Sequence, residues 1–515
     1  MKLNPFKTAV VVCLLMLLAG SVLQTAGGAP NGWGVDDAYI SYRYAKNLEM
    51  GRGLVFNPGE RVEAYTNFLY VLLLVPAFWV TNVDGAYFFS VFLNLIFATA
   101  AFLLFVGDVR RRLGESSAMA AAFLFALCLP VWVAVAWGLE SNLVLAISIA
   151  VWVLVEQTAS EPTNHAIGLL CLAMVLSLLA RADGFIIVGV ALFYLLIKKR
   201  FRALMIGTTV VVGTLVVYEC WRYSYYGYLL PNTFYAKVAG PLVPRIIHAY
   251  RQLSSIAMFE GLLPLLLVIA FALGEEIRSS FKGHSQLAEG IRFDLIFPLV
   301  WLLYWFYIGG DLYWDRFLLI LFPMGLFALL KFFAGNARGK ILAFVVVSLA
   351  FMEVAPPLRM DTRFDYRFDR YDCWIVTGKF LGANFPGKVI ATGGIGKIAF
   401  FSDLNTQDML GLADPVLAHR PVTPGDFDPG HMKFDPDYTL SRKPDLIANW
   451  ITENLDTSYN LTRAKYEKAG YRIKYLVYPG ATRPAQSILD VEGGNDATLQ
   501  QWIAKGYNFA ILVRN

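Results

Sequence analysis

A series of long apolar runs with polar motifs beyond their ends constrains this 515-residue chain more than any other feature. Hydrophobic residues make up 57% of the chain and charged residues 16%, and the mean hydropathy is +0.52. A soluble globular chain carries about 25% charged residues. We therefore predict an α-helical polytopic membrane protein that is surrounded by a lipid bilayer.

The apolar runs predict about eleven transmembrane helices. A straight span requires about 20 apolar residues, and several runs are shorter, so we expect them to extend into their polar flanks. The first run could instead be a cleaved signal peptide, because Ala26-Gly-Gly-Ala29 resembles a cleavage region, but its length favours an uncleaved helix. The predicted spans are about 8–27, 85–107, 117–136, 142–156, 165–180, 185–197, 203–219, 257–274, 291–308, 316–333 and 340–355.

Basic clusters and polar motifs fall at opposite ends of the predicted spans. Positive clusters mark the cytoplasmic side, here Arg110–Arg112, Lys198–Arg200 with Arg202, and Arg338 with Lys340. The polar motifs then face outward, where nucleotide-activated substrates are absent. This arrangement requires that the apolar segment Asn67–Val80, which contains Pro76, does not span. We predict an interfacial or re-entrant helix there.

The composition divides the chain into two domains. Residues 1–355 form the predicted transmembrane domain, with a first outer loop at 28–84, and residues 356–515 form a polar α/β domain outside the membrane. Within the polar domain, apolar stretches predict strands at Lys388–Thr392 and Tyr507–Val513, and helices are predicted at Asp445–Leu455 and Asp496–Lys505.

Charge and cysteine content exclude several classes of function. The net charge of +5 is small for this length and fits basic cytoplasmic loops, so we expect no nucleic-acid partner. The five cysteines lie far apart, without the spacing of a metal site or of a disulfide framework.

Two adjacent carboxylates, Asp36 and Asp37, open a predicted helix that ends near Gly51. An aspartate at this position can cap the helix by accepting backbone N–H groups. Capping explains one aspartate well and two poorly, because adjacent carboxylates repel unless a cation or metal lies nearby. We predict that the pair is catalytic and removes a proton from an acceptor hydroxyl. No cofactor is assigned; a divalent metal held by this pair is an alternative.

Other charged and aromatic residues recur just beyond the apolar runs. Charges at membrane depth are costly and usually paired, so salt bridges that fix helix ends are the alternative to substrate contacts. Arginine offers phosphate a planar bidentate contact and lysine a point charge. The candidate phosphate ligands are Arg181, Arg222, Lys237 and Arg316. The candidate substrate-binding residues are Arg43, Glu140, Asp183, Tyr226, Asn232 and Asp311.

As a set, these motifs resemble the mycobacterial terminal β-(1→2)-arabinofuranosyltransferases and their relatives. The opening similarity runs from Asp36-Asp37-Ala-Tyr-Ile-Ser-Tyr-Arg43 to Gly53-Leu-Val-Phe-Asn-Pro-Gly-Glu-Arg-Val-Glu63. Later similarities are Trp137-Gly-Leu-Glu140, Arg181-Ala-Asp183-Gly, Leu230-Pro-Asn-Thr-Phe-Tyr-Ala-Lys237, Gly309-Gly-Asp311 with Arg316-Phe, and Ser402-Asp-Leu with Asp408 and Gly411-Leu. The similarity covers most of the chain, and its motifs are specific as a set and weak singly.

The resemblance implies a GT-C glycosyltransferase of a bacterial inner (plasma) membrane, with its active site and C-terminal domain outside or in the periplasm. It implies a polyprenyl-phosphate sugar donor and a glycan or glycoprotein acceptor of the cell envelope. It also implies that the first outer loop carries the catalytic acidic residue, which assigns that role to the Asp36–Asp37 pair. The expected sugar is arabinofuranose. The alternatives are a GT-C transferase using another lipid-linked sugar, such as mannose or aminoarabinose, and a flippase or transporter for a lipid-linked sugar.

Overall fold

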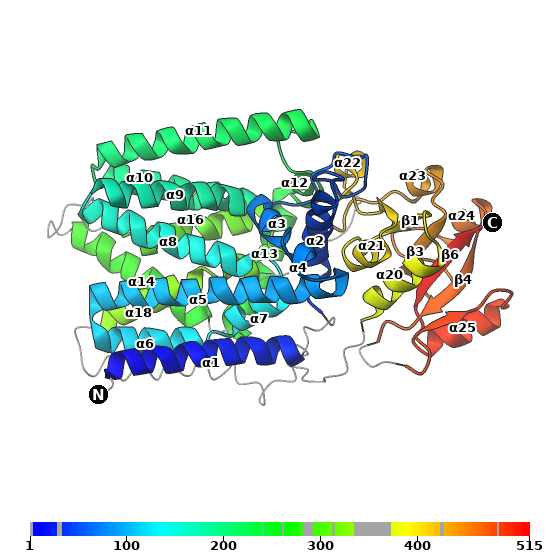
Figure 1. The fold of residues 1–515 in the computed structure, drawn as a ribbon, viewed down its shortest axis with the longest axis horizontal. Coiled ribbons are helices and arrows are strands. Elements are labelled where there is room, and N and C mark those ends of the chain that lie inside the picture. The colour runs from blue at the N-terminus through cyan, green and yellow to red at the C-terminus, as the bar shows by residue number, and fades with distance from the viewer. Residues whose placement is uncertain are drawn as a thin grey trace.

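Figure 1 shows a helical bundle with a smaller mixed α/β domain at one end of its long axis. The structure is a computed structural model that describes residues 4–27, 33–238, 240–259, 262–281, 292–311, 315–333, 372–422, 427–480 and 484–515. The N-terminus lies at the end of the bundle that faces away from the α/β domain, and the C-terminus lies in that domain.

Helices occur at ten of the eleven positions predicted as spans, and the eleventh, 340–355, lies outside the described residues. They are α1 (Pro5–Gly27), α5 (Ala86–Leu113), α6 (Glu115–Ala126), α7 (Leu129–Trp137), α8 (Ser141–Ser160), α9 (Asn164–Ala180), α10 (Phe185–Ile197), α11 (Phe201–Tyr226), α14 (Leu262–Phe281), α16 (Phe293–Ile308), α17 (Asp315–Leu318) and α18 (Leu321–Phe333). A further helix, α13 (Leu242–Phe259), precedes α14.

The helices differ in whether they are long enough to span a bilayer. Within the described ranges, α1, α5, α8 and α11 are long and apolar enough to cross a membrane. The predicted span at 117–136 is broken into α6 and α7, which bend by 45° and make a fifth span if they act as one. The others are shorter, so the structure supports a multi-pass membrane protein but does not confirm eleven spans.

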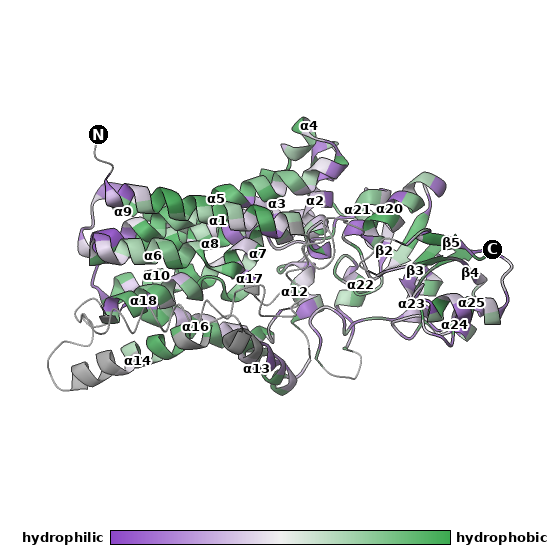
Figure 2. Cartoon of the chain, turned by 90° about the horizontal axis from the view of Figure 1, so that it is seen from below, coloured by the Kyte–Doolittle hydropathy of each residue, from purple (hydrophilic) through white to green (hydrophobic). Residues whose placement is uncertain are grey.

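The two ends of the bundle carry different chemistry. The Arg110–Arg112 cluster ends α5, and Lys198–Arg200 joins α10 to α11, both at the end away from the α/β domain (Figure 1). Hydrophilic residues gather at both ends, and hydrophobic residues dominate the length of the bundle (Figure 2). The structure therefore agrees with the predicted separation of basic clusters from polar motifs.

Short helices form the junction between the bundle and the α/β domain. They are α2 (Asp36–Glu49), α3 (Phe68–Leu74), α4 (Ala77–Val80) and α12 (Asn232–Lys237). The α2 bounds confirm the predicted helix, and the break between α3 and α4 coincides with Pro76, which cannot donate a backbone hydrogen bond. The segment Phe68–Val80 is too short to span, but whether it lies in the membrane interface stays a prediction.

The C-terminal domain contains a six-stranded sheet in its described part, with strand order β2-β1-β3-β6-β4-β5. β1 pairs in parallel with β2 and β3, and the remaining pairs are antiparallel. The strands are β1 (Val389–Thr392), β2 (Asn405–Asp408), β3 (Leu446–Trp450), β4 (Tyr471–Val477), β5 (Ile488–Asp490) and β6 (Phe509–Arg514).

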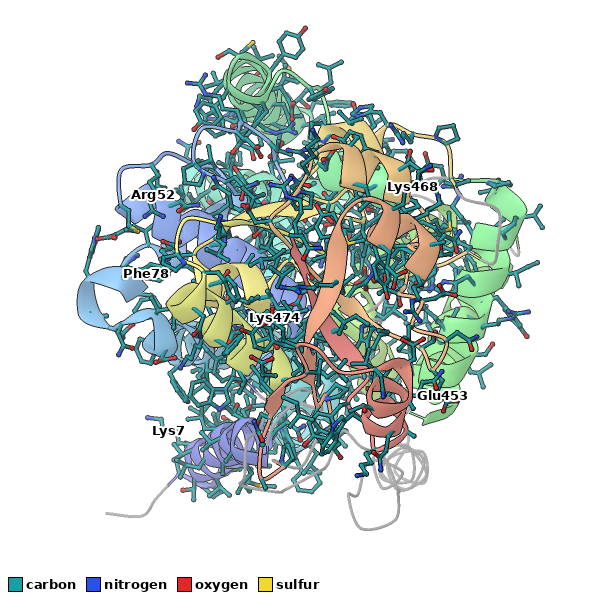
Figure 3. All side chains as sticks on the ribbon, turned by 90° about the vertical axis from the view of Figure 1, so that its right-hand side faces the viewer. Lys7, Arg52, Phe78, Glu453, Lys468 and Lys474 are labelled. Carbon is teal, nitrogen blue, oxygen red and sulfur yellow. The ribbon has the colours of Figure 1, made fainter. Side chains whose placement is uncertain are left out.

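Helices cover both faces of this sheet. The helices α20 (Cys373–Asn384) and α21 (Lys397–Ser402) pack on one face, and α24 (Arg463–Lys468) and α25 (Asp496–Ala504) pack on the other. Two shorter helices, α22 (Pro415–Ala418) and α23 (Pro436–Ser441), lie in the connections. In the end-on view of Figure 3, this domain lies in front of the end of the bundle. Arg52 and Phe78, from the junction segments, are seen beside the domain.

Three of the four elements predicted in this domain are confirmed: β1, β6 and α25. The predicted helix at Asp445–Leu455 is wrong, because this segment forms β3 between β1 and β6. Leu446, Ile447 and Ala448 are all buried. A short apolar run buried on both faces cannot be distinguished from a helical segment by its periodicity.

Candidate active site

A cavity of about 650 Å³ lies at the end of the bundle next to the C-terminal domain. It is built from α2 and the loop that follows it, the α7–α8 and α9–α10 turns, α12, α16 and the approach to α17. Seven charged residues line it: Asp37, Glu140, Arg181, Asp183, Lys237, Asp311 and Arg316. All seven were candidates from the sequence, so the structure brings together the ends of five segments that are distant along the chain.

The two aspartates at the start of α2 have different partners. Both carboxylate oxygens of Asp36 accept backbone N–H groups of the C-terminal domain, from Gly396 at 3.0 Å and from Lys397 at 2.7 Å. Asp37 lines the cavity instead and accepts a hydrogen bond from Lys237 Nζ at 3.3 Å. The pair is thus divided between a domain interface and the cavity.

The electrostatics of the two carboxyl groups differ accordingly. Burial raises the pKa of Asp36 to about 6, and the N–H group of Lys397 opposes this rise only in part. Burial also acts to raise the pKa of Asp37, but the charges of Lys237 and Arg316 outweigh it and hold that pKa below the ordinary value. Asp37 is therefore a carboxylate at neutral pH.

Charges of alternating sign continue from Asp37 across the cavity. Lys237 Nζ lies 4.0 Å from Asp311 Oδ1, in addition to its contact with Asp37. Arg316 Nε lies 2.7 Å from Asp311 Oδ2. Every one of these side chains is at least three-quarters buried. Low exposure strengthens such interactions relative to those at a protein surface.

Arg181 forms a second charged group in the same cavity. Its Nε and Nη2 atoms donate to the two oxygens of Asp183 at 2.8 and 2.7 Å. Its Nη1 atom is buried and has no hydrogen-bond partner among the described residues; Glu140 Oε1 lies 4.0 Å away, beyond hydrogen-bond distance. The N–H groups of Nη1 can therefore donate to an anion bound in the cavity.

The turn that carries Glu140 is hydrogen-bonded to both α2 and α3. Tyr42 and Tyr70 each donate a hydrogen bond to the carbonyl oxygen of Gly138 at 2.9 Å. Gly138 has φ +74°, and a Cβ atom there would overlap the Tyr42 hydroxyl, so glycine permits this close approach. Glu140 accepts a hydrogen bond from Asn67 Nδ2 at 2.8 Å.

One wall of the cavity is apolar and reaches the outer surface of the bundle. The lining includes Phe185, Leu303 and Tyr307, which are 56%, 63% and 50% exposed. In a membrane-spanning bundle such side chains face lipid. The cavity therefore combines a charged interior with an apolar opening toward the bilayer.

Arg43 and Arg222, two of the sequence candidates, lie outside the cavity lining. Arg43 is 2% exposed and donates to the carbonyl oxygens of Ala399 and Leu404 in the C-terminal domain. Arg222 is equally buried and contacts both oxygens of Glu63, with a shortest distance of 2.6 Å. The positions of both guanidinium groups support a structural function.

Tyr226 and Asn232 also lie outside the lining. The Tyr226 hydroxyl donates to the carbonyl oxygen of Leu54 at 2.9 Å and contacts the Tyr65 hydroxyl at 3.1 Å. Asn232 Nδ2 donates to the carbonyl oxygens of Gly411 and Leu412 at 2.8 and 2.9 Å. Both residues therefore connect segments around the cavity.

Several uncharged lining residues were not singled out from the sequence. Tyr65, Asn67, Tyr304 and Tyr307 come from the first outer loop and α16, and Leu412 and Pro429 come from the C-terminal domain. Asn67 stands at the start of an apolar segment, directly before α3, as the charged candidates stand at the ends of other apolar runs, so the sequence offered a signal there. Of the two residues from the C-terminal domain, Leu412 belongs to the Gly411-Leu motif of the family resemblance, whereas Pro429 had no such signal, because proline is common in loops.

The residues present do not fit a divalent metal held by the Asp36–Asp37 pair. Both oxygens of Asp36 are used by backbone N–H groups, and Asp37 contacts the cation of Lys237. In the described part of the chain, no group of three or more His, Cys, Asp or Glu side chains could hold a metal ion.

Comparisons with known proteins agree with this architecture. Residues 364–501 match the family model "Domain of unknown function (DUF8728)". The chain is 30% identical over 239 residues to a terminal β-(1→2)-arabinofuranosyltransferase of Mycobacterium tuberculosis, which covers 44% of this chain and 38% of the relative. It is 27% identical over 357 residues to the protein of the same name from Corynebacterium glutamicum, with 62% of this chain and 50% of the relative covered. The matches thus span half or less of the relatives' lengths.

Solved structures of other enzymes share this fold over most of the chain. ArnT from Cupriavidus metallidurans bound to undecaprenyl phosphate aligns with a TM-score of 0.54, at 10% identity and with 97% of each chain covered. The oligosaccharyltransferase of Archaeoglobus fulgidus aligns with a TM-score of 0.56, at 11% identity, with 96% of this chain and 75% of that chain covered. Identities this low establish the fold alone, and this GT-C-like fold agrees with the fold that the family resemblance implied.

Proposed function

We propose that this protein is a membrane glycosyltransferase that moves a sugar from a polyprenyl-phosphate donor to a cell-envelope glycan or glycoconjugate. The observation that carries the proposal is the cavity in which Asp37 lies against Lys237, Asp311 and Arg316 and which opens toward lipid. The two curated relatives support arabinofuranose as the sugar. A structural neighbour with bound undecaprenyl phosphate supports a polyprenyl-phosphate donor.

The charged groups have complementary tasks in such a transfer. The acceptor hydroxyl oxygen forms a bond to the anomeric carbon, and the bond between that carbon and the donor phosphate oxygen breaks. The hydroxyl proton passes to the Asp37 carboxylate, and the lipid phosphate departs with the bonding electron pair. Lys237, Arg316 and Arg181 hold the negative charge that develops on the departing phosphate.

Lys237 connects donor binding to the basicity of Asp37. In the structure Lys237 Nζ contacts Asp37 and holds its pKa low. A donor phosphate that attracts Lys237 weakens this contact, so burial then acts on Asp37 with less opposition. We infer that Asp37 becomes a stronger base when the donor is bound.

The apolar opening suits a donor with a long hydrocarbon chain. Phe185, Leu303 and Tyr307 provide a lipid-facing entrance, and the cations lie deeper. A polyprenyl chain can remain in the bilayer while its phosphate and sugar enter the cavity. The orientation that we propose places the cavity and the C-terminal domain outside the cytoplasm, on the basis of the basic clusters at the opposite end.

The distribution of charge favours a transferase over a flippase. A path for a charged headgroup across the membrane requires polar groups along the bundle interior. Instead, α8 carries no charged residue between Ser141 and Val155, and α16 carries none after Asp294. The cavity charges are confined to one end, where a transfer reaction needs them.

The proposal is tested by supplying the purified, lipid-reconstituted protein with synthetic polyprenyl-phosphate arabinofuranose and an arabinan oligosaccharide. We expect transfer by the wild type and a loss of about 10²-fold or more in the Asp37→Asn variant, because an amide cannot accept the proton. Parallel reactions with mannose and aminoarabinose donors identify the sugar. Asp84→Asn is the matched control, because Asp84 is in the same outer loop, is 45% exposed and contacts Lys379.

Full transfer activity in a folded Asp37→Asn variant would show that Asp37 is not the base. Absence of transfer by the wild type with every donor, together with movement of the lipid-linked sugar between leaflets, would support the flippase instead.

A further inference from the structure

We propose that the C-terminal domain, whose family has no assigned function, is a clamp that positions Asp37 against Lys237, and that Asp36 and Asn232 are its positioning residues. This inference rests on the glycosyltransferase function proposed above. The domain contributes only Leu412 and Pro429 to the described cavity lining, so its main contacts with the bundle are made elsewhere, on the helices that carry the two charged residues.

The first contact joins α2 to α21, and it matches the charges at both ends of α21. The Asp36 carboxylate accepts the N–H groups of Gly396 and Lys397 at the start of α21. Arg43, two turns further along α2, donates to the carbonyl oxygen of Ala399 within α21 and to that of Leu404, two residues beyond its C-terminal end. An anion at the start of a helix and a cation at its end both favour binding.

Ionic and aromatic contacts extend the α2–α21 interface. Asp403, directly after α21, lies 3.0 Å from Lys46 Nζ and 3.2 Å from Arg52 Nη1. The ring of Phe400 packs against Tyr39 at 5.4 Å between centroids. A Cβ atom at Gly396 would overlap the backbone carbonyl of Asp36. The two helices are therefore held along their whole shared length and at a distance that a larger residue would prevent.

The second contact joins α12 to the same domain. The side chain of Asn232, the first residue of α12, donates to the carbonyl oxygens of Gly411 and Leu412. Its backbone N–H donates to the backbone carbonyl oxygen of Glu63 at 2.9 Å. Lys433 of the domain donates to the carbonyl oxygen of Tyr235 within α12 at 2.9 Å. This helix is thus bound by the domain near both of its ends.

Both contacts place a domain-bound residue on the same short helix as a charged residue of the cavity. Asp36 precedes Asp37 at the start of α2, and Asn232 begins the six-residue helix that ends at Lys237. The Asp37–Lys237 contact joins α2 and α12, which come from distant parts of the chain. The C-terminal domain contacts both helices and so can fix that contact, in addition to the hydrogen bonds that hold α2 on the bundle, such as that of Tyr42 to Gly138.

Amide hydrogen exchange in the full-length, lipid-reconstituted protein tests the α2 contact directly. In Asp36→Asn one side-chain oxygen still accepts an N–H, but the amide nitrogen cannot accept the other. We expect the amides of Gly396 and Lys397 to exchange at least tenfold faster than in the wild type, with transfer activity reduced at least tenfold. Asn495→Ala removes the cap of α25 on the far side of the domain. It should change neither the exchange of the Gly396 and Lys397 amides nor the transfer activity.

The pH dependence of Asn232→Ala distinguishes positioning from a general loss of folded protein. The groups that act on Asp37 are Lys237 of α12, Arg316 of α17, His431 before α23, and its neighbour Asp36. Asn232→Ala leaves all of these charges in place. If α12 shifts and Lys237 withdraws, the acidic limb of the kcat/KM profile moves to higher pH; a smaller folded fraction lowers the rate equally at every pH.

Two results would overturn the clamp. One is rapid exchange at Gly396 and Lys397 in Asp36→Asn with wild-type transfer activity. The other is an Asn232→Ala variant whose activity falls without any movement of the acidic limb. Failure of the proposed function gives a different result: either the wild type transfers no sugar, or Asp37→Asn retains transfer activity while exchange at Gly396 and Lys397 stays slow.

Discussion

Replacing Arg222 distinguishes a phosphate ligand from a structural ion pair. The sequence predicted that Arg222 holds the donor phosphate, whereas in the structure its guanidinium contacts both oxygens of Glu63 and lies 2.5 Å from Glu219. In Arg222→Met the buried carboxylate of Glu63 loses its cation. Breaking a buried pair costs about 3–5 kcal/mol, and we expect about 3 because Glu63 can take up a proton.

The size of this destabilisation follows from the burial of both side chains of the pair. The side chains of Arg222 and Glu63 are each 3% exposed, and burial already raises the pKa of Glu63 above the ordinary value. Removing both charges, in Arg222→Met with Glu63→Met, leaves no uncompensated group. Such double replacements are often neutral or stabilising, so we expect the double variant to recover the stability that the single variant loses.

Thermal unfolding and donor kinetics in lipid nanodiscs provide the assay. We expect Arg222→Met to lower the apparent Tm by roughly 5 °C, and the double variant to restore both Tm and the KM for the donor. Lys237→Met is the comparison from within the cavity: its kcat/KM for the donor should fall by about 10- to 100-fold, the equivalent of a charged hydrogen bond. If the double variant is as stable as the wild type but its donor KM rises tenfold, Arg222 binds the phosphate after all.

The remaining predictions concern pH and topology. Asp37 must be ionised, and Lys237 holds its pKa below the ordinary value in the free protein. We therefore expect the acidic limb of kcat, which reports the donor complex, at higher pH than the acidic limb of kcat/KM, which reports the free protein. Coincident limbs would contradict the transfer of the Lys237 contact from Asp37 to the phosphate. In a cysteine-free variant, a single cysteine at Glu453 should react with an impermeant label on intact cells and one at Lys199 should not, and the reverse pattern would invert the topology. Both positions are exposed in the structure, so a lack of labelling reports the side of the membrane rather than burial.

The sequence predicted the location of the site better than the partners of individual residues. Ends of apolar helices in one bundle must meet at a common level, so charges beyond those ends were expected to converge, as Glu140, Arg181 and Asp311 do. The same reasoning included Arg43 and Arg222, because a charge in a polar flank has the same appearance whether it faces a cavity or a carboxylate. Glu63 is 159 residues from Arg222, and Ala399 is 356 residues from Arg43; no local pattern reveals contacts of that range.

The burial of a central strand on both of its faces also limited the prediction of the C-terminal domain. The segments with a clear period or a flanking cap were assigned correctly, such as α25, which begins after Asn495. The central strand β3 was mistaken for a helix because a strand covered on both faces lacks alternation. Its assignment depends on β1 and β6, which lie before and after it in the chain.

The Asp36–Asp37 pair shows that two residues adjacent in sequence can have different functions. Consecutive residues on an α-helix point about 100° apart, so two aspartates at the first turn of α2 need not share one site. Neither caps α2 itself, whose N-cap is Val35 without a side-chain hydrogen bond; Asp36 caps α21 instead, and Asp37 faces the cavity. Replacing either with asparagine should reduce transfer, so activity alone cannot separate the two residues. Hydrogen exchange at Lys397 can, because it changes when the cap is lost and stays slow when only the base is removed.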